Sequence, residues 1–206
     1  DNSVAIGDQA LASQNFTSST DSYNIAIGSS AGRSITTAIQ NIHIGALAGE
    51  DVTVGADNVS VGYNALSTEV GGQNNTAIGA RALRDQTSSS GNIRNTAVGS
   101  NAGMSTTTGS TNTYIGARAA ENALTGNDNV FVGYYSNLAA TDTSQVIVLG
   151  NLLTSQPANN FTFGYDSTDS NIAFGATSIS APSDERYKEE IETSTAGLGF
   201  INDLRP

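Results

Sequence analysis

The sequence contains no cysteine and no tryptophan, and only three of its 206 residues are proline. The absence of cysteine excludes disulfide bonds and thiolate metal sites, and it leaves the redox compartment undetermined. Large apolar side chains are also scarce, and aromatic residues make up 6% of the chain. A compact globule of this length needs more buried apolar area to offset the loss of chain entropy. The composition therefore disfavours an ordinary globular enzyme fold.

Positive charge is scarce as well. Eight Lys and Arg residues stand against nineteen Asp and Glu residues, so the net charge is -11. A nucleic-acid binder needs a basic track that contacts phosphates, and an electrostatic membrane anchor needs a basic cluster. No apolar run approaches the roughly 20 residues needed to span a bilayer. The sequence thus predicts neither a nucleic-acid partner nor membrane insertion, and nothing in it indicates a cofactor.

One short motif, Asn-x-x-(Ile/Val/Phe)-Gly, recurs along most of the chain. Examples are NIAIG, NIHIG, NVSVG, NTAVG, NTYIG and NVFVG, while SVAIG and VIVLG are variants without the Asn. The closing glycines are Gly7, Gly28, Gly45, Gly62, Gly79, Gly99, Gly116, Gly133, Gly150, Gly164 and Gly175. Their spacings are 21, 17, 17, 17, 20, 17, 17, 17, 14 and 11 residues. A period of 17 residues that recurs six times predicts a repeat architecture.

Each motif has the pattern of a β-strand. The residues one and three before the Gly, such as Ile42 and Ile44, are mostly β-branched and share one face of a strand. We expect this face to point into the core and the residue between them to point away. A second Gly follows in several repeats, where we expect a turn with positive φ; these glycines are Gly55, Gly72, Gly109 and Gly126.

Stacking of such units predicts an all-β fold, a parallel β-roll or β-solenoid of about 17-residue coils. Each coil would contain a strand, a turn, a short second strand and another turn. Neighbouring strands would lie about 4.8 Å apart, and the repeated Asn would form a ladder of side-chain amides. The longer segments 12–23 and 85–94 are expected to bulge from the rod as loops. Because a single coil buries little, we expect a homotrimer that buries faces of small residues.

The repeats resemble the head of trimeric autotransporter adhesins, a left-handed parallel β-roll, and the shafts of phage and viral tail fibres. The resemblance covers residues 1–178, and it implies a trimeric rod. The chain departs from that pattern in its longer period and in the two insertions. Both ends of the sequence read as cut, so we expect the chain to belong to a longer protein.

The composition changes after Ile179, where a linker over 179–182 leads into a short helical or irregular segment over 183–206. Within that segment the pattern Ser-Asp-x-Arg-x-Lys resembles the opening of the endosialidase-type intramolecular chaperone domain of phage tail spikes and fibres. In this family the domain trimerises the fibre, and many members cut themselves off. The resemblance implies cleavage between Pro182 and Ser183, with Ser183 as nucleophile, Lys188 as base, and Asp184 and Arg186 as motif residues. A linker without cleavage is the alternative.

Three further candidate sites stand out along the repeats. His43, the only histidine, occupies the middle of its strand, where three copies could hold an ion at a three-fold axis or simply pack. Tyr63, Tyr134 and Tyr135 follow closing glycines and either stack on sugar rings or cover coil edges. A row of threonines raises an ice-binding alternative; its members are Thr36, Thr53, Thr87, Thr107 and Thr141. The clustered acids Glu50, Asp51 and Asp57 read as solvated turn residues.

Taken together, the sequence predicts a structural and host-recognition component of a phage or viral tail fibre, located in the virion. Its expected partners are further copies of itself, other tail or baseplate proteins, and a glycan or protein on the host surface. Two alternatives remain open. One is a bacterial trimeric surface adhesin head, and the other is a glycan-degrading tail spike.

Overall fold

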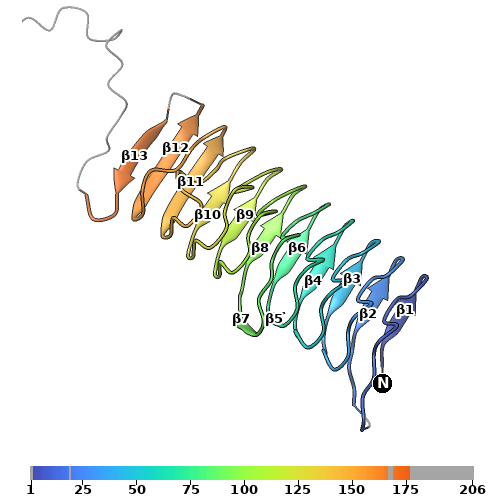
Figure 1. Ribbon diagram of the computed structural model, residues 1–206. Helices are drawn as coiled ribbons and strands as arrows, with labels where there is room; N and C mark the ends of the chain where they lie inside the picture. The colour runs from blue at the N-terminus through green and yellow to red at the C-terminus, as the bar shows by residue number, and fades with distance from the viewer. Residues whose placement is uncertain (1, 19, 167–168, 177–206) are drawn as a thin grey trace, which may run out of the picture.

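The computed structural model describes residues 2–18, 20–166 and 169–176, and this part of the chain contains strands and turns but no helix. Figure 1 shows the chain wound into coils that stack along one long axis. Eleven strands form one sheet in the order β1-β2-β3-β4-β6-β8-β9-β10-β11-β12-β13, and β5 pairs with β7 separately. The bounds are β1 (Val4–Ile6), β2 (Ile25–Ile27), β3 (Ile42–Ile44), β4 (Val59–Val61), β5 (Gly72–Gln73), β6 (Thr76–Ile78), β7 (Gly91–Asn92), β8 (Thr96–Val98), β9 (Thr113–Ile115), β10 (Val130–Val132), β11 (Val146–Asn151), β12 (Asn160–Tyr165) and β13 (Ser170–Ala173).

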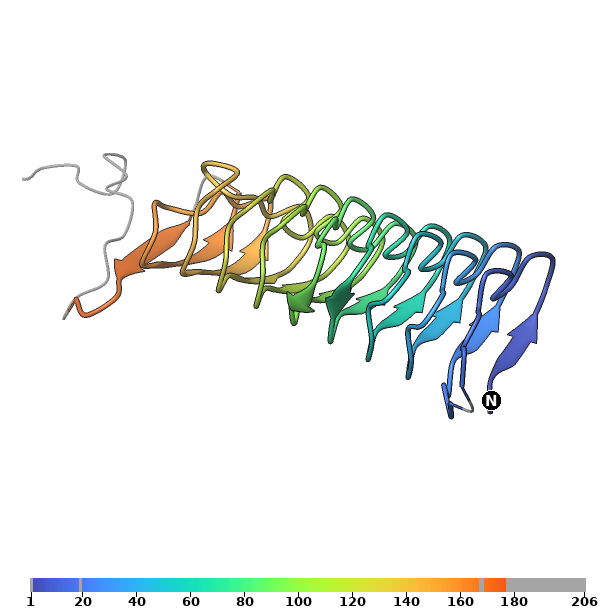
Figure 2. The ribbon, with the colours of Figure 1, turned by 60° about the horizontal axis from the view of Figure 1, so that its bottom comes forward.

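The sheet is parallel and in register from β1 to β12. Equivalent motif positions pair across neighbouring coils, so that Ile25 lies opposite Ile42, and Ile42 opposite Val59. Figure 2 shows the sheet along one side of the rod and the turns along the other. The expected all-β parallel solenoid with a coil of about 17 residues is therefore confirmed.

The last motif does not add a coil. Strand β13 pairs with β12 in the antiparallel sense, with Phe161 opposite Ile172. We expected NIAFG to continue the parallel stack, and this expectation is wrong. The 11 residues between Gly164 and Gly175 are too few to go around the rod, so the chain folds back as a hairpin.

The strand faces are the reverse of those expected. In each strand the middle residue is fully buried inside the coil, as Ala77, Tyr114 and Phe131 show. The flanking residues point outward, and Ile6 and Ile115 are 58% and 42% exposed. Period-two placement identifies a shared face but not which face is inside. We assigned the apolar pair to the core of one chain, whereas that core is narrow and takes one side chain per strand.

The narrow interior is filled by large residues set against small ones. Where the strand contributes a ring, the turn near it contributes a glycine: a Cβ at Gly49 would lie 2.3 Å from the ring of His43, and one at Gly103 would lie 2.3 Å from the ring of Tyr114. Where the strand contributes Ser or Ala, the turn four residues after the closing Gly contributes a buried leucine such as Leu66. This exchange keeps the filling of successive coils similar.

The two sets of glycines are required for different reasons. The closing glycines have positive φ, as in Gly62 at +133°, and a Cβ there would also lie 2.7 Å from the Gly79 backbone. Gly55 and Gly109 do not have positive φ, so our turn explanation for the second set is wrong. They are small because the next coil passes close by: a Cβ at Gly55 would lie 2.4 Å from the Gly72 carbonyl oxygen.

The asparagine ladder is confirmed, and it bonds mainly to the backbone. The Oδ1 atom of Asn58 accepts a hydrogen bond from the backbone N–H of Asn75 at 3.0 Å. Its Nδ2 atom donates to the carbonyl of Gly72 at 2.9 Å. The same backbone contact from one Asn to the next links Asn24, Asn41, Asn58, Asn75, Asn95, Asn112 and Asn129. Each fully buried amide therefore ties its own coil to the next one.

The insertion over 85–94 is less independent than a bulging loop. Its strand β7 pairs in parallel with β5 of the preceding coil, with Gly72 opposite Gly91. The segment therefore lies along the rod and extends the pairing on a second side. Figure 1 shows the other long coil, which contains residues 12–23, extending from the rod near the N-terminus.

Candidate interaction surfaces

The most extensive candidate surface is the outer face of the long sheet, which we call the outer strand face. It consists of the two residues that flank the buried residue in each strand from β1 to β12. These positions hold Val, Ile, Thr, Leu or Phe and carry no charge. Exposed members include Val4 at 44%, Ile6 at 58%, Ile27 at 36%, Ile78 at 40%, Val98 at 37%, Ile115 at 42% and Leu149 at 39%. A continuous exposed apolar face of this kind marks an interaction site.

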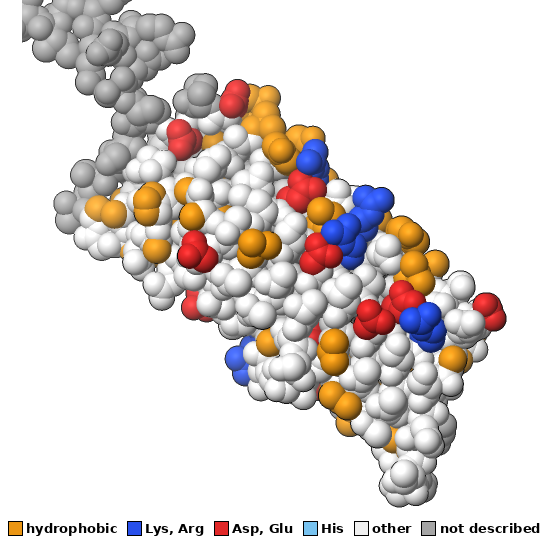
Figure 3. All heavy atoms as spheres, viewed as in Figure 1, with side chains coloured by type: hydrophobic (Ala, Val, Ile, Leu, Met, Phe, Trp, Pro, Cys, Tyr) orange, Lys and Arg blue, Asp and Glu red, His pale blue; other side chains and the backbone are white. Residues whose placement is uncertain are grey.

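The apolar character of the outer strand face becomes aromatic towards its C-terminal end. Phe161 and Phe163 of β12 continue the two rows, pairing with Ile147 and Leu149 of β11. Their ring centroids lie 5.0 Å apart. Charged side chains lie elsewhere: those visible in Figure 3 are sparse, and acidic and basic groups gather along its upper right edge.

His43 lies inside the rod, so it does not lie on a face that could line a three-fold axis. Its Nδ1 atom is 2.7 Å from the hydroxyl of Ser60, and its Nε2 atom has no hydrogen-bond partner. Burial lowers the pKa of His43 to about 4, because the charged imidazolium would lose its hydration. The described residues contain no group of three His, Cys, Asp or Glu side chains that could hold a metal ion. The geometry therefore favours a packing role.

The three candidate sugar-binding tyrosines are not equivalent. Tyr63 is 50% exposed, but the residues at its position in the adjacent coils are Ala46 and Ala80. Tyr134 is 49% exposed, and its ring centroid lies 6.0 Å from that of Tyr135. The structure thus brings Tyr134 and Tyr135 together and leaves Tyr63 without an aromatic neighbour in the flanking coils.

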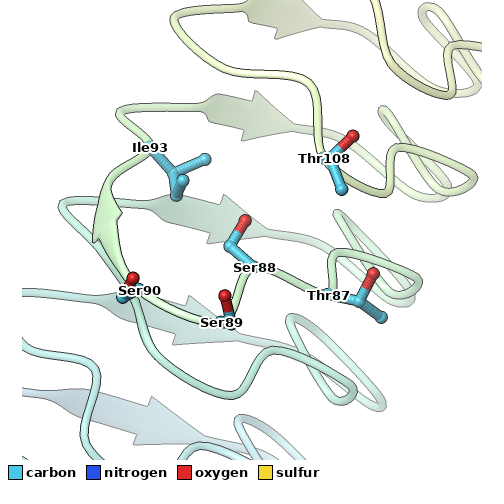
Figure 4. Close-up of a pocket in the computed structure, with 6 residues that line it drawn as sticks. All are labelled: Thr87, Ser88, Ser89, Ser90, Ile93 and Thr108. Atoms are coloured by element: carbon cyan, nitrogen blue, oxygen red, sulfur yellow. The ribbon is translucent and has the colours of Figure 1, made fainter.

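The insertion over 85–94 borders a shallow groove of about 240 Å³ (Figure 4). Three consecutive serines of the insertion line it together with one isoleucine and two threonines; the residues are Thr87, Ser88, Ser89, Ser90, Ile93 and Thr108. None of these side chains is titratable at neutral pH. A groove of uncharged hydroxyls has neither an acid nor a base for catalysis.

A buried carboxylate stands beneath this insertion, and the sequence reasoning missed it. The Oε1 atom of Glu69 accepts hydrogen bonds from the backbone N–H groups of Val70 at 2.9 Å, Gly71 at 3.2 Å and Gly72 at 2.8 Å. Its Oε2 atom accepts from Ser88 N–H at 3.4 Å. Burial raises the pKa of Glu69, and the backbone hydrogen bonds oppose that rise. Glu69 thus ties its own turn to the insertion in the following coil.

The threonine row is part of the hydrogen bonding between coils. Thr36, Thr53 and Thr107 donate their hydroxyls to carbonyls of the following coil at 3.2, 3.1 and 2.9 Å. Hydroxyls used in this way are less available to order water, which weakens the ice-binding alternative.

The proposed cleavage residues Ser183, Asp184, Arg186 and Lys188 lie outside the described residues, as does the linker over 179–182. Among the residues that the structure describes, no helix is long and apolar enough to cross a membrane. Comparisons with protein-family models, with curated proteins and with solved structures give no significant match.

Proposed function

We propose that the chain forms the shaft of a trimeric phage or viral tail fibre and that its copies associate through the outer strand face. The observation that carries the proposal is the uninterrupted pair of apolar rows on that face. In a single chain these side chains face water, whereas burying them should stabilise an assembly by about 25 cal/mol per Å² of apolar surface. Faces of this kind that run parallel to the rod suit a cyclic arrangement of parallel copies.

This proposal moves the contact between copies away from the place we first expected. The small residues of each coil are largely used within the chain, since Ala31, Ala48 and Ala65 are fully buried. They cannot form a contact between chains without unpacking the coil. The apolar rows are available for that contact, and the number three rests on the resemblance of the repeats to trimeric adhesin heads.

The role in a tail fibre rests on the C-terminal motif. Its resemblance to the intramolecular chaperone domain favours a fibre over a bacterial adhesin head, because adhesin heads lead into a neck and a stalk. In this proposal the chaperone domain assists trimer folding and cleaves itself off before Ser183. A receptor on the host surface and other tail proteins are the expected partners of the finished shaft.

The assembly is tested by placing a charge on the outer strand face. Ile115 is 42% exposed on that face, and Leu124 is 38% exposed at a turn. We expect Ile115→Lys to dissociate the oligomer in sedimentation velocity at micromolar concentration, because a buried unpaired ammonium is costly. Leu124→Lys is the matched control and should sediment like the unmodified chain. An Ile115→Lys variant that remains fully oligomeric contradicts the proposed interface.

A further inference from the structure

A second surface near the C-terminal end of the rod combines aromatic and polar groups, and we call it the tyrosine patch. It occupies the two positions that follow the closing glycine in consecutive coils. The position directly after the Gly holds Tyr134, Asn151 and Tyr165, and the next one holds Arg118, Tyr135 and Leu152. The parallel stack places these residues on neighbouring rungs, since Asn151 pairs with Tyr165.

The rings of the patch are exposed and held in place. Tyr134 and Tyr165 are 49% and 59% exposed, and two rungs separate them, which is about 10 Å at the usual strand spacing. The guanidinium carbon of Arg118 lies 4.3 Å from the ring centroid of Tyr135. The same guanidinium donates from Nε to Glu121 at 2.7 Å. Tyr135 is thus fixed beneath a cation that is itself paired.

Polar groups lie between and beside the rings. The side chain of Asn151 is exposed on the rung between Tyr134 and Tyr165, and its Oδ1 atom accepts from the backbone N–H of Tyr134 at 2.7 Å. Its side-chain N–H groups are directed to no residue by any bond of the patch described here. Asp166 follows Tyr165 and is exposed as well. The patch therefore offers flat apolar rings next to amide and carboxylate groups.

We propose that the tyrosine patch binds a neutral saccharide. A pyranose ring has an apolar face of C–H groups that stacks on an aromatic ring, and a rim of hydroxyls that bonds to amides and carboxylates. The only guanidinium in the patch is paired with Glu121, Asp166 adds negative charge, and the chain carries a net charge of -11. These charges disfavour an acidic saccharide. The inference rests on the proposed role in host recognition, and it names the class of ligand.

The test uses the full chain on an array of neutral hexose and N-acetylhexosamine oligosaccharides, with sialylated and sulfated glycans on the same surface. We expect binding to neutral glycans and a loss of about tenfold or more in Tyr134→Ala and in Tyr165→Ala, which corresponds to one stacking contact. Tyr63→Ala is the matched control and should bind like the unmodified chain. Circular dichroism of each variant checks that the rod is folded.

Each other outcome overturns the proposal. Absence of binding to every neutral glycan, equal binding by all variants, or a preference for acidic glycans contradicts a neutral-saccharide site at the patch. Sedimentation of the same samples separates this result from the fate of the assembly. A monomer that binds glycans through Tyr134 would refute the trimer and keep the site, whereas a trimer that binds none would refute the site alone.

Discussion

Removing one rung of the asparagine ladder provides a quantitative test of how the coils are held together. In Asn58→Ala the Asn75 N–H loses its acceptor at 3.0 Å, the Asn75 Nδ2 group loses a contact at 3.1 Å, and the Gly72 carbonyl loses a donor at 2.9 Å. Asn58 and Asn75 are fully buried, so water cannot readily replace these bonds. An unsatisfied buried polar group costs about 1–3 kcal/mol.

Two such groups predict a loss of about 2–4 kcal/mol per chain from the free energy of unfolding, after partial relaxation of the site. For a chain of this size the melting temperature should fall by about 5–15 °C. The measurement is thermal unfolding followed by circular dichroism, with all variants at the same concentration because self-association shifts the midpoint. The matched control is Asn92→Ala, since Asn92 is exposed and its Oδ1 atom only accepts from the exposed Asn74 side chain at 2.7 Å.

Asn92→Ala should cost no more than about 0.5 kcal/mol, as most exposed substitutions do. A further variant, Asn58→Asp, keeps an acceptor for Asn75 N–H but points a carboxylate oxygen at the Gly72 carbonyl. It should also be destabilised, and more so at neutral than at acid pH. If Asn58→Ala and Asn92→Ala melt at the same temperature, the ladder does not hold the coils together and the reasoning is refuted.

Three more outcomes follow from single residues. The pKa of His43 is about 4 when folded and about 6.5 when unfolded. The unfolded chain therefore takes up the proton first, and stability should fall by about 2 kcal/mol per chain between pH 7.5 and pH 5; urea unfolding of His43→Phe should lack this slope, and an identical slope contradicts the buried neutral state. Gly62→Val should cost about 3 kcal/mol or more, because φ is +133° and the Cβ meets the Gly79 backbone, whereas exposed Ser89→Ala should be neutral; equal tolerance of both changes would mean that the coil is wrongly described. In a chain that continues through a complete chaperone domain, mass spectrometry should find Ser183→Ala uncut but still trimeric, and unchanged cleavage would remove Ser183 as nucleophile.

Much of the fold could be predicted because each coil repeats the same local requirements. The closing glycines recur because the turn needs a backbone conformation that other residues rarely adopt. The asparagines recur because each one bonds to the next coil. Both constraints act within a few residues and are visible in the sequence as a fixed spacing of 17.

The direction of the strand faces could not be predicted from that spacing. The alternation in Ile42-His43-Ile44 defines two faces, and the rule that apolar residues lie inside a single chain selected the wrong one. A signal for the correct choice was present in the size exchange between strand and turn. Rings at His43 and Tyr114 coincide with Gly49 and Gly103, which indicates that the central position and the turn share one interior.

The buried acid and the final hairpin depended on contacts that the repeat does not encode. Glu69 occupies the place held by Ile35 and Val52 in the two preceding coils, and its burial depends on backbone N–H groups of its own turn and of the insertion. The hairpin of β12 and β13 is signalled only by the short spacing before Gly175. The tyrosine patch requires knowing that Tyr134, Asn151 and Tyr165 lie on successive rungs, although they are 17 and 14 residues apart.

The mass of the assembly in solution tests the central claim most directly. Sedimentation equilibrium at micromolar concentration should give about 63 kDa, which is three times the chain mass of 21.0 kDa. The same sample should lose its folded circular-dichroism signal in one transition together with the assembly, because the outer strand face is buried only in the trimer. A stable, folded species of 21.0 kDa would show that the apolar rows remain in water and would contradict the trimeric shaft.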